Sequence, residues 1–165
     1  MPIHPIPPLF SEKSETLILG SFPSVKSREA AFFYGHPQNR FWAVLAAVYG
    51  CEKPGTVEEK KHLVLENRLA LWDVIGECDI QGSADSSIKS VTANDLSVIL
   101  DNCRIKRIFV NGKTAEKYYN KYTLPKTGIK AVCLPSTSPA NAAWSFERLV
   151  EAWKIITLSE NPNKM

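Results

Sequence analysis

The chain has 165 residues, of which 44% are hydrophobic and 22% are charged. These proportions suit one folded domain with a proper core and argue against a disordered chain. No apolar run approaches the roughly 18 residues that a membrane span needs, so we expect no membrane association. The net charge of +3 is only mildly basic, and by itself it points to no class of partner.

The N-terminus, MPIHPIPPLF, lacks the basic start and long apolar stretch of a secretory signal. We interpret residues 1–14 as a proline-rich arm and residues 159–165 as a loose tail, both attached to a single domain that spans 1–165. The four cysteines show no CxxC spacing, and the three histidines form no zinc-like pair with them. We therefore predict reduced thiols, no metal site and a cytoplasmic location.

In chain order, the first predicted strand covers residues 16–19, where the apolar run TLIL meets a glycine and a proline-containing loop. A helix is expected at about 39–49, because large apolar residues recur there at helical spacing before Gly50. A charged second helix over 56–68 precedes a second strand over 69–75, which has the sequence LALWDVI.

The polar segment 76–90 contains two glycines and is predicted to be mostly loop. A helix is expected over 92–102, with Thr92 as its cap and Asp95 three residues later, as in a capping box. The remaining predicted elements are a strand, a helix, a strand and a helix at 107–110, 112–122, 129–134 and 142–157. Such alternation predicts an α/β fold, namely a three-layer α/β/α sandwich around a mostly parallel central sheet of about four strands.

Three polar segments follow predicted strands: GSFPS with YGHPQN behind it, NGK, and PSTSPANA. Ligands of open α/β sheets bind beyond the carboxyl ends of the strands, so we expect these segments to gather at one edge. None of them is a GxxxxGK[ST] or GxGxxG loop, which disfavours ATP or a dinucleotide, and no cofactor is expected. Residues 104–130 hold eight basic residues against one acidic residue, which fits either a polyanion partner or an ordinary solvated face.

The segments LILGSFPS, FYGHPQNRFW, NGKTA and LPSTSPANA resemble the uracil-DNA glycosylase superfamily over about residues 15–155. HPQNRFW is similar to the mismatch-specific uracil and thymine glycosylases, whose Gly-x-Asn-Pro-Gly motif falls where this chain has GSFPS. Phe22 stands in place of the motif's Asn. GSFPS together with PSTSPANA is most similar to the hypoxanthine-DNA glycosylases, which remove deaminated adenine from DNA.

This resemblance implies a monofunctional DNA glycosylase of base excision repair, a hydrolase that cleaves the N-glycosidic bond of deaminated bases, chiefly hypoxanthine in deoxyinosine. Monofunctional activity follows from the lack of lysine in the matched motifs, Lys113 excepted. DNA would be the partner, bound with its damaged base flipped into a pocket, and we expect a monomer. The alternatives are a mismatch-specific uracil or thymine glycosylase, a non-catalytic nucleic-acid-binding module, or a small-nucleotide-binding domain.

The resemblance places the catalytic residue at Asn39, whose amide would orient the attacking water in place of the missing motif Asn. From the sequence alone, Asn39 is also a plausible helix N-cap, and the two roles can coexist. Tyr34 would stack on the flipped base, unless it is simply a core aromatic. Asn111 would read hypoxanthine through paired amide contacts, the alternative being an ordinary Asn-Gly turn.

The other site residues implied by the resemblance come from two loops. Ser21 and Phe22 would offer backbone groups to the base, and Pro23 would hold their turn. The residues expected to contact DNA phosphates are Ser24, Ser136, Thr137 and Ser138. Relatives often carry His where this chain has Leu134, and its absence argues against strong uracil activity.

Two acidic residues are left over. Asp73 lies in an apolar strand, where a buried carboxylate needs partners, so it is either structural or assists the water. Asp85 is most simply a loop residue.

Overall fold

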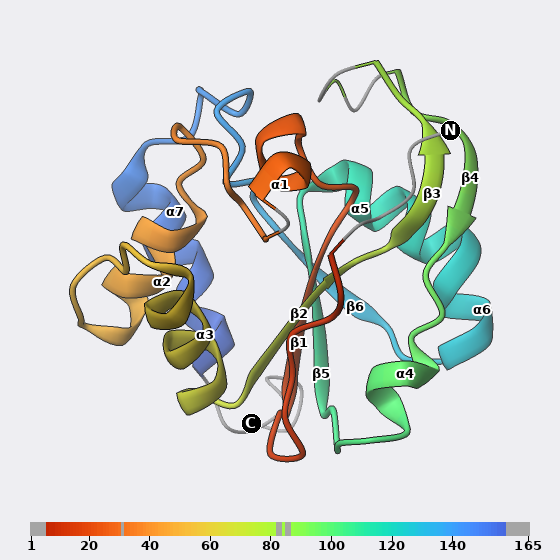
Figure 1. Ribbon diagram of the computed structural model, residues 1–165, viewed down its shortest axis with the longest axis horizontal. Coiled ribbons are helices and arrows are strands. Elements are labelled where there is room, and N and C mark those ends of the chain that lie inside the picture. The colour runs from red at the N-terminus through yellow and green to blue at the C-terminus, as the bar shows by residue number, and fades with distance from the viewer. Residues whose placement is uncertain (1–5, 31, 82–83, 85–86, 158–165) are drawn as a thin grey trace.

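The computed structural model describes residues 6–30, 32–81, 84 and 87–157 (Figure 1). Its centre is a four-stranded sheet in the order β2-β1-β5-β6, and every neighbouring pair is parallel. The strands are β1 (Thr16–Gly20), β2 (Leu69–Asp73), β5 (Arg107–Asn111) and β6 (Ala131–Leu134). Every residue of β1 and β2 is buried, as expected for parallel strands covered on both faces.

Helices cover both faces of this sheet, which confirms the predicted three-layer α/β fold (Figure 1). One side carries α2 (Phe41–Tyr49), α3 (Val57–Glu66) and α7 (Phe146–Trp153), the last followed by a 3-10 turn, Lys154–Thr157. The other side carries α4 (Ser97–Leu100), α5 (Lys113–Tyr118), a π-helical turn (Tyr119–Thr123) and α6 (Leu124–Thr127). The short helix α1 (Val25–Ala30) lies beyond the carboxyl end of β1.

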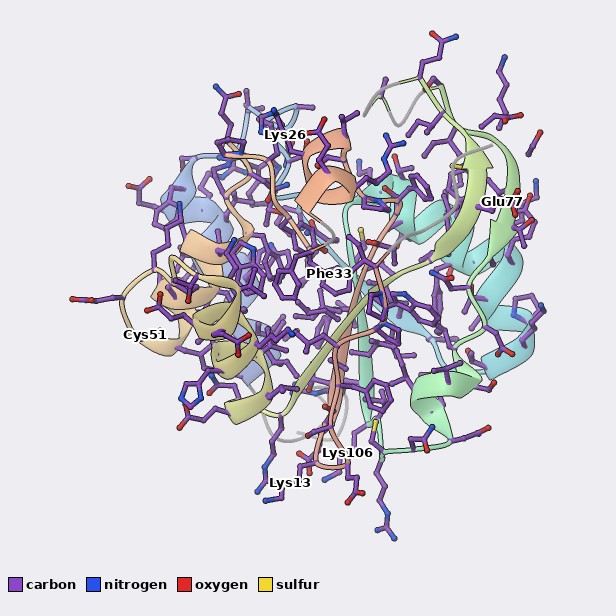
Figure 2. The ribbon with its side chains drawn as sticks, viewed as in Figure 1. Lys13, Lys26, Phe33, Cys51, Glu77 and Lys106 are labelled. Atoms are coloured by element: carbon purple, nitrogen blue, oxygen red, sulfur yellow. The ribbon has the colours of Figure 1, made fainter. Side chains whose placement is uncertain are left out.

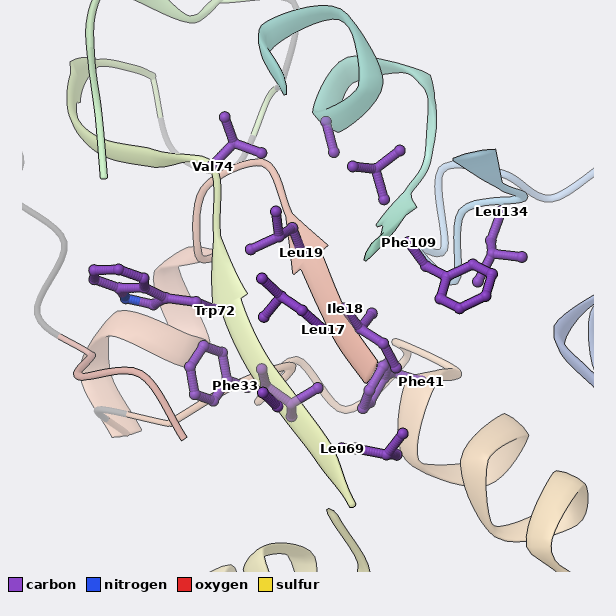
Figure 3. Close-up of a cluster of buried hydrophobic side chains, with 14 of the residues drawn as sticks. Leu17, Ile18, Leu19, Phe33, Phe41, Leu69, Trp72, Val74, Phe109 and Leu134 are labelled. Carbon is purple, nitrogen blue, oxygen red and sulfur yellow. The ribbon is translucent and has the colours of Figure 1, made fainter. Parts of the chain in front are cut away.

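The core fills the space between the sheet and its helices. Leu17, Ile18 and Leu19 of β1 are fully buried, and Phe41 of α2 packs beside them (Figure 3). Phe33 lies inside the molecule, whereas charged side chains such as Lys106 project outward (Figure 2). A continuous apolar core of this kind holds the carboxyl ends of the strands in fixed positions.

The described part of the proline-rich arm, from residue 6 onward, lies along β2. Leu9 N donates to Leu71 O at 3.0 Å, and Leu71 N donates to Leu9 O at 2.9 Å. The indole N–H of Trp72 donates to Ile6 O at 3.2 Å. The arm thereby covers an edge strand that would otherwise expose unpaired backbone groups. The predicted loose tail, 159–165, lies outside the described residues.

The largest difference from the sequence predictions is an antiparallel hairpin of β3 (Ile75–Asp79) and β4 (Lys89–Ala93). The loop predicted over 76–90 missed both of these strands, and the helix predicted over 92–102 is reduced to α4, which begins at Ser97. The Asn94 side chain donates to Asp73 O at 2.9 Å and Ile75 O at 3.3 Å, so it competes with helix formation. The remaining helix, α4, has four residues.

One further helix and the bounds of two others also differ from the predictions. Helix α1 was not predicted at all. The last helix begins after Ser145, whose hydroxyl accepts a hydrogen bond from Arg148 N at 3.2 Å, so residues 142–144 precede it. Helical structure after β5 continues to Thr127 rather than stopping at 122.

Candidate active site

The polar segments that follow the strands meet at one cavity of about 530 Å³. It lies beyond the carboxyl ends of β1, β2 and β5, where the connections from β1 and β5 leave in opposite directions. Its size suits a small ligand such as a nucleobase. All ten residues predicted from the sequence line it: Ser21, Phe22, Pro23, Ser24, Tyr34, Asn39, Asn111, Ser136, Thr137 and Ser138.

Gly20 and Asp73 form the part of the wall where β1 and β2 end. They are paired in register, and Val74 N donates to Gly20 O at 2.8 Å. A Cβ on Gly20 would collide with Asp73 Oδ1 and lie 3.1 Å from the Tyr34 hydroxyl oxygen, so any side chain there would displace the Asp73 carboxylate. Asp73 is 4% exposed and lines the cavity. Its carboxylate, which the sequence left between two roles, therefore belongs to the site.

Tyr34 forms another part of the wall and is held in an unusual conformation. Its φ of 52° is in the left-handed region, which costs free energy for a bulky residue and often marks functional sites. The ring stacks on Phe41 with centroids 3.9 Å apart and planes at 15°. One face of Tyr34 is thus occupied by the core, which fixes the position of the ring beside the cavity.

The Tyr34 hydroxyl is buried, and no described residue meets hydrogen-bond geometry with it. Burial raises the pKa of this phenol strongly, and the nearby charge of Asp73 raises the pKa further. The polar Asn111 side chain lowers the pKa and offsets part of this rise. The phenol therefore stays protonated in any physiological buffer.

Replacing Tyr34 by Phe should leave the fold at least as stable as the wild type. The substitution removes a buried hydroxyl without a partner and keeps the stacked ring, so the free energy of unfolding should stay equal or rise by up to about 1 kcal/mol. Urea denaturation of the two proteins measures the difference. A loss of more than about 1 kcal/mol would show that the hydroxyl makes a stabilising hydrogen bond.

A chain of hydrogen bonds joins Asn39, Thr137 and Asn111 at the back of the cavity. Asn39 Oδ1 accepts from Phe41 N at 2.9 Å and from the Thr137 hydroxyl at 2.9 Å. Asn111 Nδ2 donates to Thr137 Oγ1 at 3.0 Å, and Asn111 Oδ1 accepts from Thr137 N at 3.1 Å. The N-cap of α2 is Arg40 rather than Asn39, so the alternative role suggested by the sequence is wrong, although the Asn39 side chain still accepts the first N–H of the helix.

Arg40 ties the same loop to the start of α2. Its backbone N–H donates to Thr137 O at 3.1 Å, and its guanidinium donates to the carbonyl oxygens of Asn141 and Trp144. These bonds hold the loop after β6 against the segment that carries Asn39.

The loop after β6 presents small hydroxyl side chains at the rim. Thr137 is fully buried and its hydroxyl is engaged by Asn39 and Asn111, so its side chain has no hydroxyl hydrogen left for a phosphate. Ser136 and Ser138 are half-buried and line the cavity. Ser136 Oγ accepts from Ser138 N at 3.1 Å, which leaves its hydroxyl hydrogen for another acceptor.

Ser27, which was not predicted from the sequence, also lines the cavity. Ser27 Oγ accepts from Gly35 N at 2.7 Å and so fixes the turn that carries Tyr34. Ser24 caps α1, because its hydroxyl accepts from Ser27 N at 3.1 Å. The pattern Pro-Ser-x-x-Ser could have revealed this helix start. Asp85, considered from the sequence, lies outside the described residues.

Within the described residues, no group of three or more His, Cys, Asp or Glu side chains is placed to hold a metal ion. The same part of the chain contains no helix that is both long and apolar enough to span a membrane.

Comparison with known proteins shows the family. The sequence model of the Uracil DNA glycosylase superfamily matches residues 7–157. The chain belongs to this superfamily. A protein of Methanosarcina acetivorans named hypoxanthine DNA glycosylase is 35% identical over 152 residues, which are 91% of this chain and 94% of that protein. A protein of the same name from Methanosarcina barkeri is 32% identical over 137 residues, 82% of this chain and 85% of its own.

A solved structure of similar fold comes from the same genus as these two relatives. The solution NMR structure of a candidate uracil DNA glycosylase from Methanosarcina acetivorans superimposes with a TM-score of 0.73 at 31% identity, covering 92% of this chain and 96% of that one. The superfamily fold therefore extends through nearly the whole chain, including the strands and loops that build the cavity.

Proposed function

We propose that this member of the uracil DNA glycosylase superfamily is a monofunctional DNA glycosylase that removes deaminated bases, chiefly hypoxanthine, in base excision repair. The observation that carries the proposal is the meeting of Asn39, Asn111 and Tyr34 in one cavity of nucleobase size. The names of the two Methanosarcina relatives support hypoxanthine as the base.

The reaction requires a flipped nucleotide, because the glycosidic bond cannot be reached inside the duplex. The C1′–N bond breaks with its electron pair left on the base, water oxygen bonds to C1′, and the proton of the water passes to the base or to solvent. The cavity must therefore stabilise negative charge on the departing base and hold a water molecule.

We assign the water to Asp73, the one carboxylate among the described residues that line the cavity. A carboxylate accepts a hydrogen bond from water and is favoured next to an oxocarbenium-like sugar. Asn39 is the proposed catalytic amide, and Tyr34, Asn111 and the backbone of Ser21 and Phe22 are proposed to bind the base. No lysine is among the described cavity-lining residues, which supports hydrolysis without Schiff-base formation and strand cleavage.

A groove beside the cavity fits the DNA strand next to the flipped nucleotide. The two share Ser136 and Ser138, and the groove is also lined by Lys113 and Lys117 from α5 and by Trp144. Both lysines are exposed. We propose that Ser136, Ser138 and these lysines contact phosphates, so that binding weakens as salt increases. Ser24 is proposed to join them by turning its hydroxyl hydrogen from Ser27 Oγ, which it meets at 3.1 Å, to the phosphate.

Because cavity and groove adjoin, one face of one molecule suffices to bind DNA. We propose on this ground that the protein acts as a single-domain monomer. From its proposed role in DNA repair we further propose that it works in the cytoplasm.

The test is incubation with duplexes that carry hypoxanthine, uracil or thymine mismatches, followed by alkaline cleavage at abasic sites. We expect release of hypoxanthine, with strand cleavage only after alkali. Preferential release of mismatched uracil or thymine would instead indicate a mismatch-specific uracil or thymine glycosylase. Salt-sensitive binding without release of any base would overturn the enzyme assignment and leave a nucleic-acid-binding module.

A further inference from the structure

Two backbone N–H groups fix the orientation of both amides in the cavity. A backbone N–H can only donate, so the side-chain atom that faces it must be an oxygen. Phe41 N lies 2.9 Å from the Asn39 amide, and Thr137 N lies 3.1 Å from the Asn111 amide. Each amide therefore turns its oxygen toward the protein at that contact.

The direction of the remaining bonds follows. With Asn111 Oδ1 facing Thr137 N, Asn111 Nδ2 is the group 3.0 Å from Thr137 Oγ1, and it donates. The Thr137 hydroxyl accepts this bond, and its single hydrogen goes to Asn39 Oδ1 at 2.9 Å. Asn39 Oδ1 thus receives two donors, as many as a carbonyl oxygen has lone pairs.

What remains of the Asn39 amide is its NH₂ group. Asn39 lines the cavity, and among the described residues none accepts a hydrogen bond from Nδ2. An amide that orients water by accepting a water proton needs a free oxygen. Here the oxygen is occupied, and the group left for a ligand is a hydrogen-bond donor.

We propose that Asn39 acts as a hydrogen-bond donor to the departing base, and that Thr137 is the positioning residue that locks the amide in this polarity. The inference rests on the proposed function and refines it, since the sequence had suggested that Asn39 orients the water. Every base that leaves as an anion gains electron density on its ring nitrogen and oxygen acceptors. A fixed donor strengthens as that charge develops, which is the condition for lowering the barrier.

Asn39→Asp separates the two roles. Aspartate keeps the shape and retains acceptors for Phe41 N and the Thr137 hydroxyl, so the fold is preserved, but it offers no NH₂ group. We expect kcat for hypoxanthine release to fall by about 10²-fold or more, as far as in Asn39→Ala. If Asn39 instead aimed the water through its oxygen, Asn39→Asp would retain activity within about tenfold of the wild type, and that result would overturn the proposal.

Two substitutions test Thr137: one removes its hydroxyl and the other keeps it. Thr137→Val keeps the shape and removes the hydroxyl, and should lower kcat about tenfold while the Kd for an uncleavable 2′-fluoro-deoxyinosine duplex stays nearly constant. Thr137→Ser keeps the hydroxyl and should return kcat to within about threefold of the wild type. Wild-type kcat in Thr137→Val, or no recovery in Thr137→Ser, would contradict the positioning role.

Failure of this inference is distinguishable from failure of the proposed function. An active wild type with an active Asn39→Asp variant rejects the donor role alone. A wild type that releases no base from any duplex rejects the glycosylase assignment, and the donor role falls with it.

Discussion

Replacing Asn39 by Ala should lower kcat for hypoxanthine release by about 10²–10³-fold, the range found when one preorganised donor is removed from an active site. The Kd for an uncleavable deoxyinosine duplex should change little, because most of the binding free energy comes from phosphate contacts elsewhere on the face. Single-turnover release and equilibrium binding of the same duplex measure the two quantities.

The substitution also removes an acceptor from Phe41 N and from the Thr137 hydroxyl, which should cost about 1 kcal/mol of stability. Urea denaturation shows whether the protein remains folded under assay conditions. Gln38→Ala is the matched control, since Gln38 is an exposed amide next to Asn39 that does not line the cavity. Turnover in Asn39→Ala equal to that of Gln38→Ala would reject Asn39 as the catalytic residue.

The parallel sheet and the location of the site could be predicted because they depend on short, local patterns. TLIL and RIFV are apolar runs of strand length, and β1 and β5 each extend one residue beyond them. The strand predicted from LALWDVI starts at Leu69 as expected, but β2 ends at Asp73 and Ile75 begins β3. Parallel strands carry their carboxyl ends to one edge, so the loops after them had to converge whatever the strand order. The cavity that joins the motif loops bears this out.

The β3–β4 hairpin could not be predicted in this way. Its sequence is polar. Within β3 the buried residues are Ile75 and Cys78, three positions apart, and no residue of β4 is buried, so no clear alternation marks the hairpin. Its strands form because each supplies the other with backbone partners, and local propensity is too weak to decide between a strand and the helix that Thr92 and Asp95 suggested.

The orientation of the Asn39 amide could not be predicted from the sequence either. Asn39 and Thr137 are 98 positions apart, and Asn111 and Thr137 are 26 apart. A motif shows which side chains are present, but not which end of an amide faces the ligand. That choice depends on hydrogen-bond partners brought together by α2, β5 and the loop after β6, and it changes the chemistry assigned to Asn39 from acceptor to donor.

The largest effect on stability is expected at Trp153, in the last turn of α7. Its side chain is fully buried and meets Phe41 edge-on, with ring centroids 5.7 Å apart and planes at 84°. Its indole N–H donates to Pro135 O at 2.9 Å, at the start of the loop after β6. Phe41 in turn stacks on Tyr34, so Trp153 supports two walls of the cavity from behind.

Trp153→Ala should therefore lower the free energy of unfolding by about 3–5 kcal/mol, through the cavity it leaves and the unpaired Pro135 carbonyl. Urea denaturation at constant temperature measures this, and the Tm should fall in parallel. Trp144→Ala is the matched control, because Trp144 is only half-buried and makes no indole hydrogen bond within the described residues, and it should cost less than about 1.5 kcal/mol. Equal losses in the two variants would mean that α7 does not support the site through Phe41 and Pro135.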